Sequence, residues 1–342
     1  MVYHNRLGSQ GERVERVQAI ARAIGQKLGG DALASQADQA ALLAKADLLT
    51  DMVGEFPELQ GIMGRYYAQH DGLHDDIAFA LEDHYKPRFG GDELPRSKVG
   101  ICVALADKLE TLAGLFGIGQ IPTGDKDPFA LRRHGLGVVR MLVERKLELA
   151  LDDLIENALA AFGDLLTDTV SLAQLPRFMM DRLNGYLRTE LDYSAQEVEA
   201  TLAADVRIWS DVVQRLEAVR AFAALPEAAA LAAANKRVGN ILKKAEGAVG
   251  DLVDAALLQE AAEQALHRAL EQIAPQADAA FDAGDYTASL QALAALREPV
   301  DAFFDNVMVN AEDAQLRANR LALLQQMHRA MNRVADLARL AA

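Results

Sequence analysis

The sequence is poor in cysteine, in aromatic residues and in long apolar runs, and each shortage excludes a class of protein. Cys102 is the only cysteine among 342 residues, which excludes an intrachain disulfide and a zinc site built from cysteines. Aromatic residues make up 6% of the chain, and no alternating β-branched run of strand length occurs, so helices are favoured. No apolar run reaches the roughly 20 residues that cross a bilayer, and no signal peptide precedes the first helix. We therefore expect an all-α, multi-domain protein that works in the cytoplasm without a membrane partner.

Positive charge is also in short supply. The formal net charge is −15, from 35 basic and 50 acidic residues. Such a balance argues against a nucleic-acid-binding protein with a broad cationic surface, and we expect no DNA partner. Residues 228–342 are acidic too, with 11 basic and 15 acidic side chains. Any RNA binding must therefore come from basic residues that cluster locally.

The sequence signatures of a nucleotide-activating active site are missing as well. The chain has no glycine-rich phosphate loop and no adenylation signature of the His-x-Gly-His type. It also has no strand-rich segment from which an antiparallel catalytic sheet is built. We therefore expect no catalytic residue and no cofactor on this chain alone.

Hydrophobic periodicity, capping residues and the positions of glycine and proline predict helices along the whole chain. The first group of expected helices covers residues 10–28, 38–53, 57–70, 75–85, 95–116 and 128–146. The second group, rich in alanine and leucine, covers 151–162, 175–190, 194–204 and 207–223. The last covers 226–246, 251–272, a helix starting at Pro299 and 311–340, with a break at Pro275. Three domains are predicted from these groups: a helical module at 1–146, a helical connector at 147–225 and a helical bundle at 226–342.

The stretch 104–133 connects two of the expected helices of the first module. Its first helix has an apolar face and a charged face, the latter made of Asp107, Lys108 and Glu110. For the first two of these residues, a buried ion pair with a neighbouring helix and simple exposure both fit the pattern. Asp127 followed by Pro128 predicts the N-cap and first turn of the next helix. The helix over 10–28 is expected to turn its arginines mostly outward.

Several long motifs, in one order along the chain, carry a family resemblance. They read GEFPELQGIMGRYY at 54–67, PTGDKDPFALRR at 122–133, LAAANKRVGNILKK at 231–244 and FFDNVMVN at 303–310. Together with Ala106-Asp107-Lys108 they resemble the bacterial glycyl-tRNA synthetase β subunit. The β chain of that family is about twice this long, so the resemblance implies its C-terminal half.

The resemblance implies a fold and a role. The fold would be an HD-like helical module, a connector and a C-terminal DALR-type anticodon-binding bundle of the kind shared with arginyl-tRNA synthetases. The role would be the non-catalytic, tRNA-recognising part of glycine-tRNA ligase, which binds the anticodon and positions tRNA(Gly). The separate α subunit would activate glycine with ATP and Mg²⁺ inside an α2β2 tetramer.

An enzymatic alternative rests on the first module. HD-type phosphohydrolases, which the family's module resembles in fold, hold a divalent metal with a His-Asp pair plus distant histidine and aspartate residues. Here the pair's position reads Lys45-Ala46-Asp47, and alanine does not ligate a metal. The other candidates of this degenerate set are His84 and Asp107. We favour a scaffold without metal, with a phosphohydrolase as the alternative.

The strongest binding candidate lies near residue 240. On a helix, the spacing puts one amide and four cations on one side, and they are Lys236, Arg237, Asn240, Lys243 and Lys244. Cations of this kind suit phosphates, and Asn240 suits a base edge in an unstacked loop. The alternative is a solvated helix face with Glu246 as its counter-charge.

Four further arginines are candidate tRNA contacts. Arg317 and Arg320 are three residues apart on the last expected helix and face one way. Arg132 and Arg133 lie just inside the helix that Asp127 starts, where they bind a phosphate or pair with Glu55 or Glu58. A purely structural helical protein that binds a partner is the third interpretation, which the acidity favours.

Overall fold

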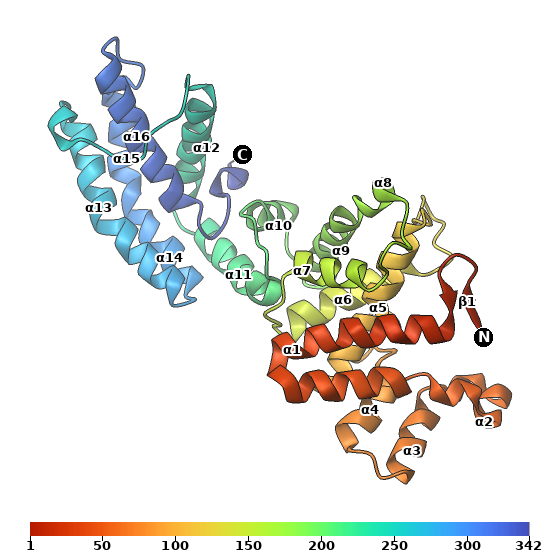
Figure 1. Cartoon of the computed structure of the whole chain (residues 1–342). Helices are drawn as coiled ribbons and strands as arrows, with labels where there is room; N and C mark the ends of the chain where they lie inside the picture. The colour runs from red at the N-terminus through yellow and green to blue at the C-terminus, as the bar shows by residue number, and fades with distance from the viewer. Residues whose placement is uncertain (342) are drawn as a thin grey trace. The chain divides into compact units, whose positions relative to one another are not determined.

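The computed structural model describes residues 1–341 and confirms the all-α prediction. Apart from one small antiparallel pair of strands, β1 (Val2–His4) and β2 (Gly8–Ser9), the regular structure within these residues is helical (Figure 1). None of its helices is long and apolar enough to span a membrane. The chain divides into two compact units, Met1–Glu190 with Arg207–Ser210, and Leu191–Val206 with Asp211–Ala342.

The first unit contains both strands and nine α-helices. They are α1 (Gln10–Leu43), α2 (Asp51–Glu55), α3 (Ile62–His70), α4 (Asp75–Asp83), α5 (Lys98–Gly117), α6 (Leu131–Glu144), α7 (Leu151–Ala160), α8 (Thr169–Leu172) and α9 (Leu175–Thr189). Short 3-10 helices are η1 (Ala46–Leu49) and η2 (Pro57–Leu59), while η3 (Trp209–Asp211) straddles the division.

Helix α1 is a helical hairpin. Ser9 and Glu12 cap its start reciprocally, which satisfies two backbone amides. Gly30, with φ of 72° and ψ of −160°, breaks the helix, close to the end at residue 28 that the sequence predicted. A Cβ at Gly25 would lie 2.9 Å from Cα of Ala34, so this glycine lets the two arms touch. The second arm ends at Leu43 rather than continuing to residue 53.

Helix α5 forms the core of the first unit, since every residue from Val99 to Gly117 is buried. Its charged face is therefore buried too, and Glu110 is fully enclosed between Arg13 (2.8 Å) and Arg16 (2.9 Å). The outward placement expected for those two arginines is wrong, because the α5 carboxylates draw them into the interior. Asp107 pairs with Arg13 at 3.1 Å, so for this residue the buried ion pair is the correct alternative, whereas Lys108 is buried without a carboxylate partner within residues 1–341.

Helix α6 begins three residues later than predicted. Asp127 does cap the helix, but its carboxylate accepts from the backbone amides of Leu131 (2.8 Å) and Arg132 (2.9 Å). Ala130 precedes the first turn in a left-handed conformation with φ of 54°. Residues 128–130 therefore form a turn that carries the chain into the helix.

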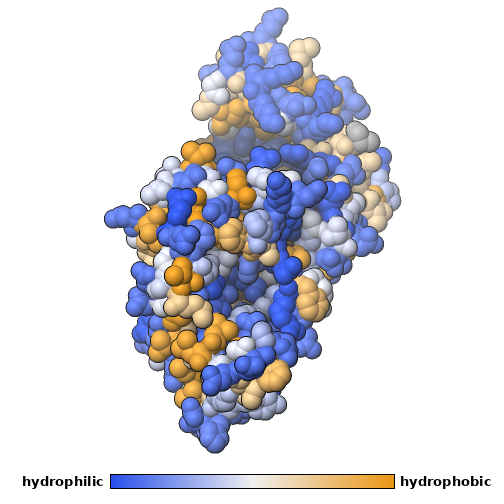
Figure 2. Space-filling model, turned by 90° about the vertical axis from the view of Figure 1, so that its right-hand side faces the viewer, coloured by the Kyte–Doolittle hydropathy of each residue, from blue (hydrophilic) through white to orange (hydrophobic). Residues whose placement is uncertain are grey.

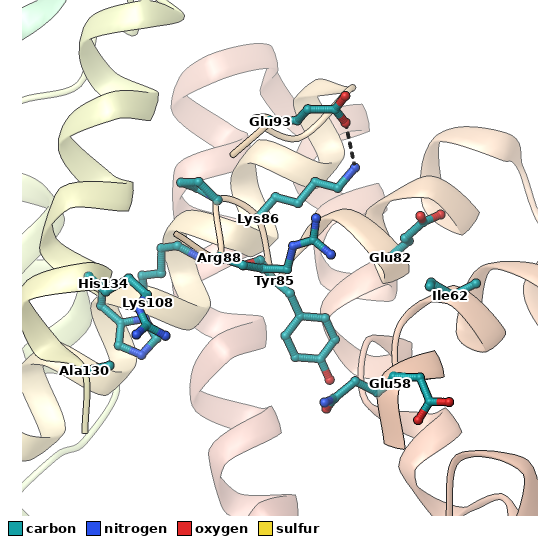
Figure 3. Close-up of a pocket in the computed structure, with 13 residues that line it drawn as sticks. Glu58, Ile62, Glu82, Tyr85, Lys86, Arg88, Glu93, Lys108, Ala130 and His134 are labelled. Carbon is teal, nitrogen blue, oxygen red and sulfur yellow. Dashed lines mark hydrogen bonds and ion pairs between the residues drawn. The ribbon is translucent and has the colours of Figure 1, made fainter. Parts of the chain in front are cut away.

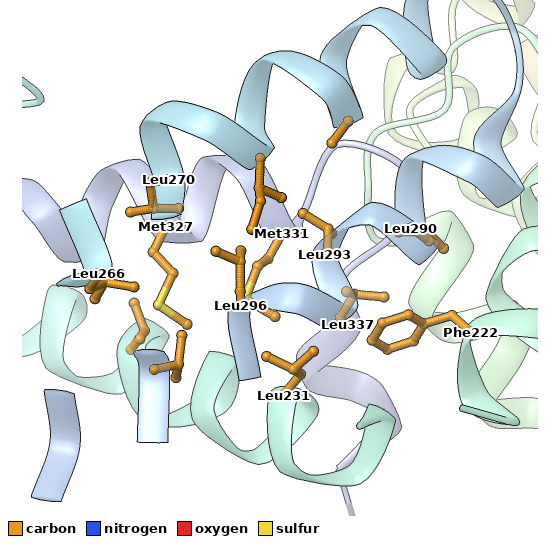
Figure 4. Packing of buried hydrophobic residues seen from close by; sticks show 14 of the residues in the cluster. Phe222, Leu231, Leu266, Leu270, Leu290, Leu293, Leu296, Met327, Met331 and Leu337 are labelled. Carbon is orange, nitrogen blue, oxygen red and sulfur yellow. The ribbon is translucent and has the colours of Figure 1, made fainter. Parts of the chain in front are cut away.

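The second unit is a bundle around an apolar cluster that includes Leu296, Phe303 and Met327, none with any exposed surface (Figure 4). Its helices are α10 (Ala195–Leu202), α11 (Val212–Ala223), α12 (Ala228–Lys244), α13 (Ala261–Asp282), α14 (Tyr286–Ala292), α15 (Arg297–Asn306) and α16 (Ala314–Met331). Three 3-10 helices, η4 (Ala255–Leu257), η5 (Leu293–Leu296) and η6 (Leu337–Leu340), complete it.

Helix α13 runs through Pro275, where a break was predicted. Pro275 removes one backbone donor, but Ile273 and Ala277 on either side are buried in the cluster, and this packing holds the helix together. The helix starts at Ala261 rather than at 251. The predicted connector 147–225 supplies helices to both units, and the three-domain division stays a prediction.

The surface is hydrophilic over much of the face seen in Figure 2, with apolar patches between the polar residues. The large apolar side chains that are more than two-thirds exposed are Met1, Val2, Leu49, Val170, Leu252 and Met308. Single exposed apolar residues are normal on a folded protein and imply no function by themselves.

Candidate functional site

Helix α12 presents the predicted basic strip to solvent. Leu231, Ala232 and Val238 are buried on one side of the helix. All five predicted residues on the other side are exposed: Lys236, Arg237, Asn240, Lys243 and Lys244. Lys243 and Lys244 occupy the last turn, where the helix dipole favours cations. The helical spacing in the sequence therefore identified the exposed side of this helix.

The cations of this strip have no acidic partner among residues 1–341. Within residues 1–341, no carboxylate lies within 4 Å of a basic group on Lys236, Arg237, Lys243 or Lys244. The guanidinium of Arg237 lies 4.3 Å from the centre of the Phe304 ring and packs on its face. The proposed counter-charge, Glu246, forms no ion pair with the strip. The strip therefore presents four cations that would not have to leave a carboxylate partner to bind an anion.

Part of the strip lines a polar groove of about 560 Å³ in the second unit. Lys236, Asn240 and Lys243 form one wall. The opposite wall comes from α16 and the segment that follows it, with His328, Asn332, Asp336 and Arg339. Cations, amides and an imidazole are the groups that bind RNA phosphates and base edges.

Two asparagines hold the walls of this groove together. Asn235 on α12 and Asn332 exchange side-chain hydrogen bonds of 2.8 and 3.0 Å. Asn332 also donates to the carbonyl of His328 at 2.7 Å and accepts from the backbone amide of Leu337 at 3.2 Å. Because Asn235 is fully buried, this network fixes α12 against the C-terminal segment and sets the width of the groove.

The sequence did not identify His328, Asn332 or Arg339 as part of the site. Burial lowers the pKa of His328 below its ordinary value, so the imidazole is neutral at pH 7 and both donates and accepts hydrogen bonds. These residues lie about ninety positions from the α12 strip in the sequence, and only the packing of α16 and η6 against α12 brings them to it.

The two arginines predicted on the last helix do not line this groove. The guanidinium of Arg317, which is half-buried, donates to the carbonyl of Ala311 at 2.7 Å. Arg320 is 6% exposed and pairs at 2.9 Å with Glu263, which has no exposed surface. Its charge is neutralised inside the bundle, so we leave Arg320 out of the interface proposed below.

The other predicted pair belongs to the first unit. Arg132 donates to the carbonyl of Gly124 at 2.6 Å and so closes the loop before α6. Arg133 is exposed, and no carboxylate within residues 1–341 pairs with it. Neither reaches Glu55 or Glu58, the partners considered from the sequence. Arg133 lines a second pocket, described further below.

Two of the degenerate HD positions, His84 and Asp107, contact the ammonium group of Lys45. Lys45 Nζ lies 3.3 Å from Asp107 Oδ1 and 2.9 Å from His84 Nε2. Because an ammonium only donates, His84 Nε2 accepts and its Nδ1–H donates to the carbonyl of Leu81 at 2.7 Å. Burial raises the pKa of the Asp107 carboxyl, but the surrounding positive charges, Arg13 and Lys45 foremost, together hold that pKa well below its ordinary value.

The third HD position, Asp47, is bound by backbone groups of the protein. Asp47 is buried and its carboxylate accepts from the backbone amides of Gly61 (2.6 Å) and Gly64 (3.0 Å). No group of three or more histidine, cysteine or acidic side chains within residues 1–341 is arranged to hold a metal ion. This centre is a buried ion network in which Lys45 and Arg13 are the cations that neutralise Asp107.

Comparisons with known proteins agree with this geometry. Residues 1–203 match the glycyl-tRNA synthetase beta subunit family, and residues 231–339 match the DALR anticodon binding domain. The whole chain is 70% identical to the glycine–tRNA ligase beta subunit of Thiobacillus denitrificans and 67% identical to that of Dechloromonas aromatica. The chain covers 48% of each relative's length.

The chain is therefore a helical protein with an anticodon-binding domain, and the polar groove lies in the unit that contains this domain. The chain belongs to the glycyl-tRNA synthetase beta subunit family. It spans about half the length of the curated relatives that it matches.

Proposed function

We propose that this chain is the tRNA-recognising part of a glycine-tRNA ligase, and that the groove of the second unit binds the anticodon loop of tRNA(Gly). The observation that carries the proposal is the unpaired basic strip of α12 beside a polar groove, inside the segment that matches the anticodon-binding family. In this role Lys236, Lys243 and Lys244 hold phosphates, which fixes the register of the RNA but carries no sequence information.

Base recognition falls to the neutral polar groups of the groove. Asn240 offers a side-chain amide that donates and accepts, as the edge of an unstacked base requires. His328 offers a neutral imidazole on the facing wall. Phe304 is covered by Arg237, and Phe303 is buried in the core. We therefore do not assign base stacking to either ring.

The remaining partners follow from the family and belong to the same proposal. Glycine activation with ATP and Mg²⁺ takes place on the α subunit, with which the complete β chain forms an α2β2 tetramer in the cytoplasm. The first unit serves as an HD-like scaffold. Because Lys45 engages both His84 and Asp107, the structure gives no support to the phosphohydrolase alternative.

A gel-shift titration of the chain with tRNA(Gly) at several salt concentrations tests the role. We expect a complex whose affinity falls steeply with salt, with a slope of about −0.7 for each phosphate contacted in a single-stranded loop. A purely structural role predicts no salt-dependent RNA binding. Absence of a complex at low salt would remove the proposed function.

A further inference from the structure

The first unit contains a pocket that the groove of the second unit does not explain. It measures about 520 Å³, a volume within the range of small-molecule sites. Residues from η2, α3, α4, the loop before α5, α5 itself and α6 line it (Figure 3). Six of its side chains carry the argument: Glu82, Lys86, Arg88, Lys108, Arg133 and His134.

Lys108 is the unusual member of this set. The residue is 2% exposed, and its ammonium has one long hydrogen bond of 3.4 Å, to the carbonyl of Tyr85. No carboxylate within residues 1–341 lies within 4 Å of it. A buried ammonium without a partner is costly for a folded protein. An anion that enters the pocket would give this ammonium the counter-charge that it lacks.

The backbone makes room for this lysine. A Cβ at Gly137 on α6 would lie 2.7 Å from Lys108 Cε, so the glycine lets the lysine stem pass between α5 and α6. Figure 3 shows Lys108 beside His134 and Ala130, at one end of the pocket. Burial lowers the pKa of His134 to about 4. This imidazole is therefore neutral at pH 7 and adds a hydrogen-bonding group without charge.

The other charges of the pocket are paired, apart from the exposed carboxylate of Glu58, for which residues 1–341 supply no ion-pair partner. Glu82 pairs with Arg65 and, at 3.0 Å, with Arg96. Lys86 pairs with Asp83 and Glu93, and Arg88 pairs with Asp92. Glu58 and Glu82 lie at the end opposite Lys108 in Figure 3. Lys108 and Arg133 thus remain as two cations of the pocket that have no acidic partner within residues 1–341.

We propose that this pocket binds a terminal phosphate group, held by the Lys108 ammonium and the Arg133 guanidinium, with His134 as a neutral hydrogen-bond partner. A phosphate monoester brings nearly two negative charges and three strong acceptor oxygens at pH 7, which matches two cations. A free mononucleotide and the 5′ end of an RNA both carry this group. The inference rests on the first unit alone and does not depend on the function proposed for the groove.

Titration of Lys108 gives the proposal a pH dependence. Burial lowers its pKa to about 8, with Asp107 opposing the shift and Lys45 and Arg13 reinforcing it; Asp92 also faces it. The ammonium form binds the anion, so affinity is full below this pKa and falls as pH rises through it. The phosphate is already a dianion above about pH 7 and the arginine keeps its charge. We expect about a tenfold loss of affinity between about pH 7 and about pH 9.

Calorimetric titration of the whole chain with inorganic phosphate and with AMP tests the proposal, and adenosine serves as the ligand without phosphate. Lys108→Met keeps the apolar stem and is expected to weaken phosphate and AMP binding at least about tenfold and to abolish its pH dependence. Lys98→Met is the matched control: the residue is exposed on the same helix, does not line the pocket, and its loss should leave binding unchanged.

The source of the phosphate is decided by two further ligands, a short RNA with a 5′ phosphate and the same RNA with a 5′ hydroxyl. If the 5′ phosphate strengthens RNA binding and Lys108→Met removes that difference, the pocket takes an RNA end; if Lys108→Met weakens AMP binding and the two RNAs bind equally, it takes a free nucleotide. Arg133→Gln, at an exposed position, should weaken either ligand without affecting the melting temperature. Equal affinity of wild type and Lys108→Met, or no binding of phosphate or AMP at about 10 mM, overturns the proposal.

Discussion

Replacing Lys243 and Lys244 together by glutamate is expected to weaken tRNA(Gly) binding between about tenfold and a hundredfold at low salt. Both side chains are exposed in the last turn of α12 and pair with no carboxylate within residues 1–341, so their charge is available to RNA phosphates. If each contacts one phosphate of a single-stranded loop, the salt slope falls in magnitude by about 1.4. Gel-shift titrations of wild type and variant at several salt concentrations measure both quantities.

The matched control replaces Arg268 and Arg297 by glutamate. These two arginines lie on α13 and α15, outside the groove. This change alters the net charge of the chain by the same amount. A loss of affinity specific to the α12 variant indicates local contact. An equal loss in both variants indicates that only the total charge matters. Unchanged melting temperatures exclude unfolding, because exposed positions contribute little to stability.

Glu263→Ala is expected to destabilise the second unit by about 3–5 kcal/mol. Glu263 is fully buried, accepts from Arg320 Nε at 2.9 Å and accepts from the backbone amides of Gln259 and Glu260. Its removal leaves the Arg320 guanidinium buried without a counter-charge, which is among the most costly single changes in a protein. Urea unfolding followed by circular dichroism measures the loss.

The same pair predicts a pH effect and a coupled double variant. Burial by itself raises the pKa of Glu263. The hydrogen bonds from Arg320 and the backbone together outweigh this effect, so the pKa lies below its ordinary value. The pair thus stabilises the fold above about pH 4, and this contribution is lost as pH falls. Glu263→Gln with Arg320→Met should cost less than the two single changes together. Strict additivity, or a mild Glu263→Ala effect, would show that the ion pair does not hold the bundle.

The local elements of the fold were largely predictable, because they depend on neighbours in the sequence. Gly30 marked the break in α1, and Asp127 marked the start of α6 to within three residues. The exceptions are positions where packing overrides local preference. Helix α13 continues through Pro275 because the apolar cluster holds both flanks. Arg13 is buried because Asp107 and Glu110 lie inside the core.

The site was only half predictable for the same reason. The exposed side of α12 follows from helical spacing alone, and the structure places its five predicted residues there. The facing wall, with His328 and Arg339, comes from a distant segment, and no local pattern indicates it. Arg320 shows the same helical spacing as the residues of the strip, but its side chain is buried in the bundle, because it forms an ion pair there with Glu263.

The central claim is that the α12 groove recognises the anticodon loop, and the affinity of the chain for tRNA(Gly) with a substituted anticodon tests it most directly. Each mismatched base that a protein reads through hydrogen bonds costs about 1–3 kcal/mol. We therefore predict that a transcript with two anticodon bases exchanged binds at least about tenfold more weakly than tRNA(Gly) at equal salt. Equal affinity for the two transcripts would contradict the account.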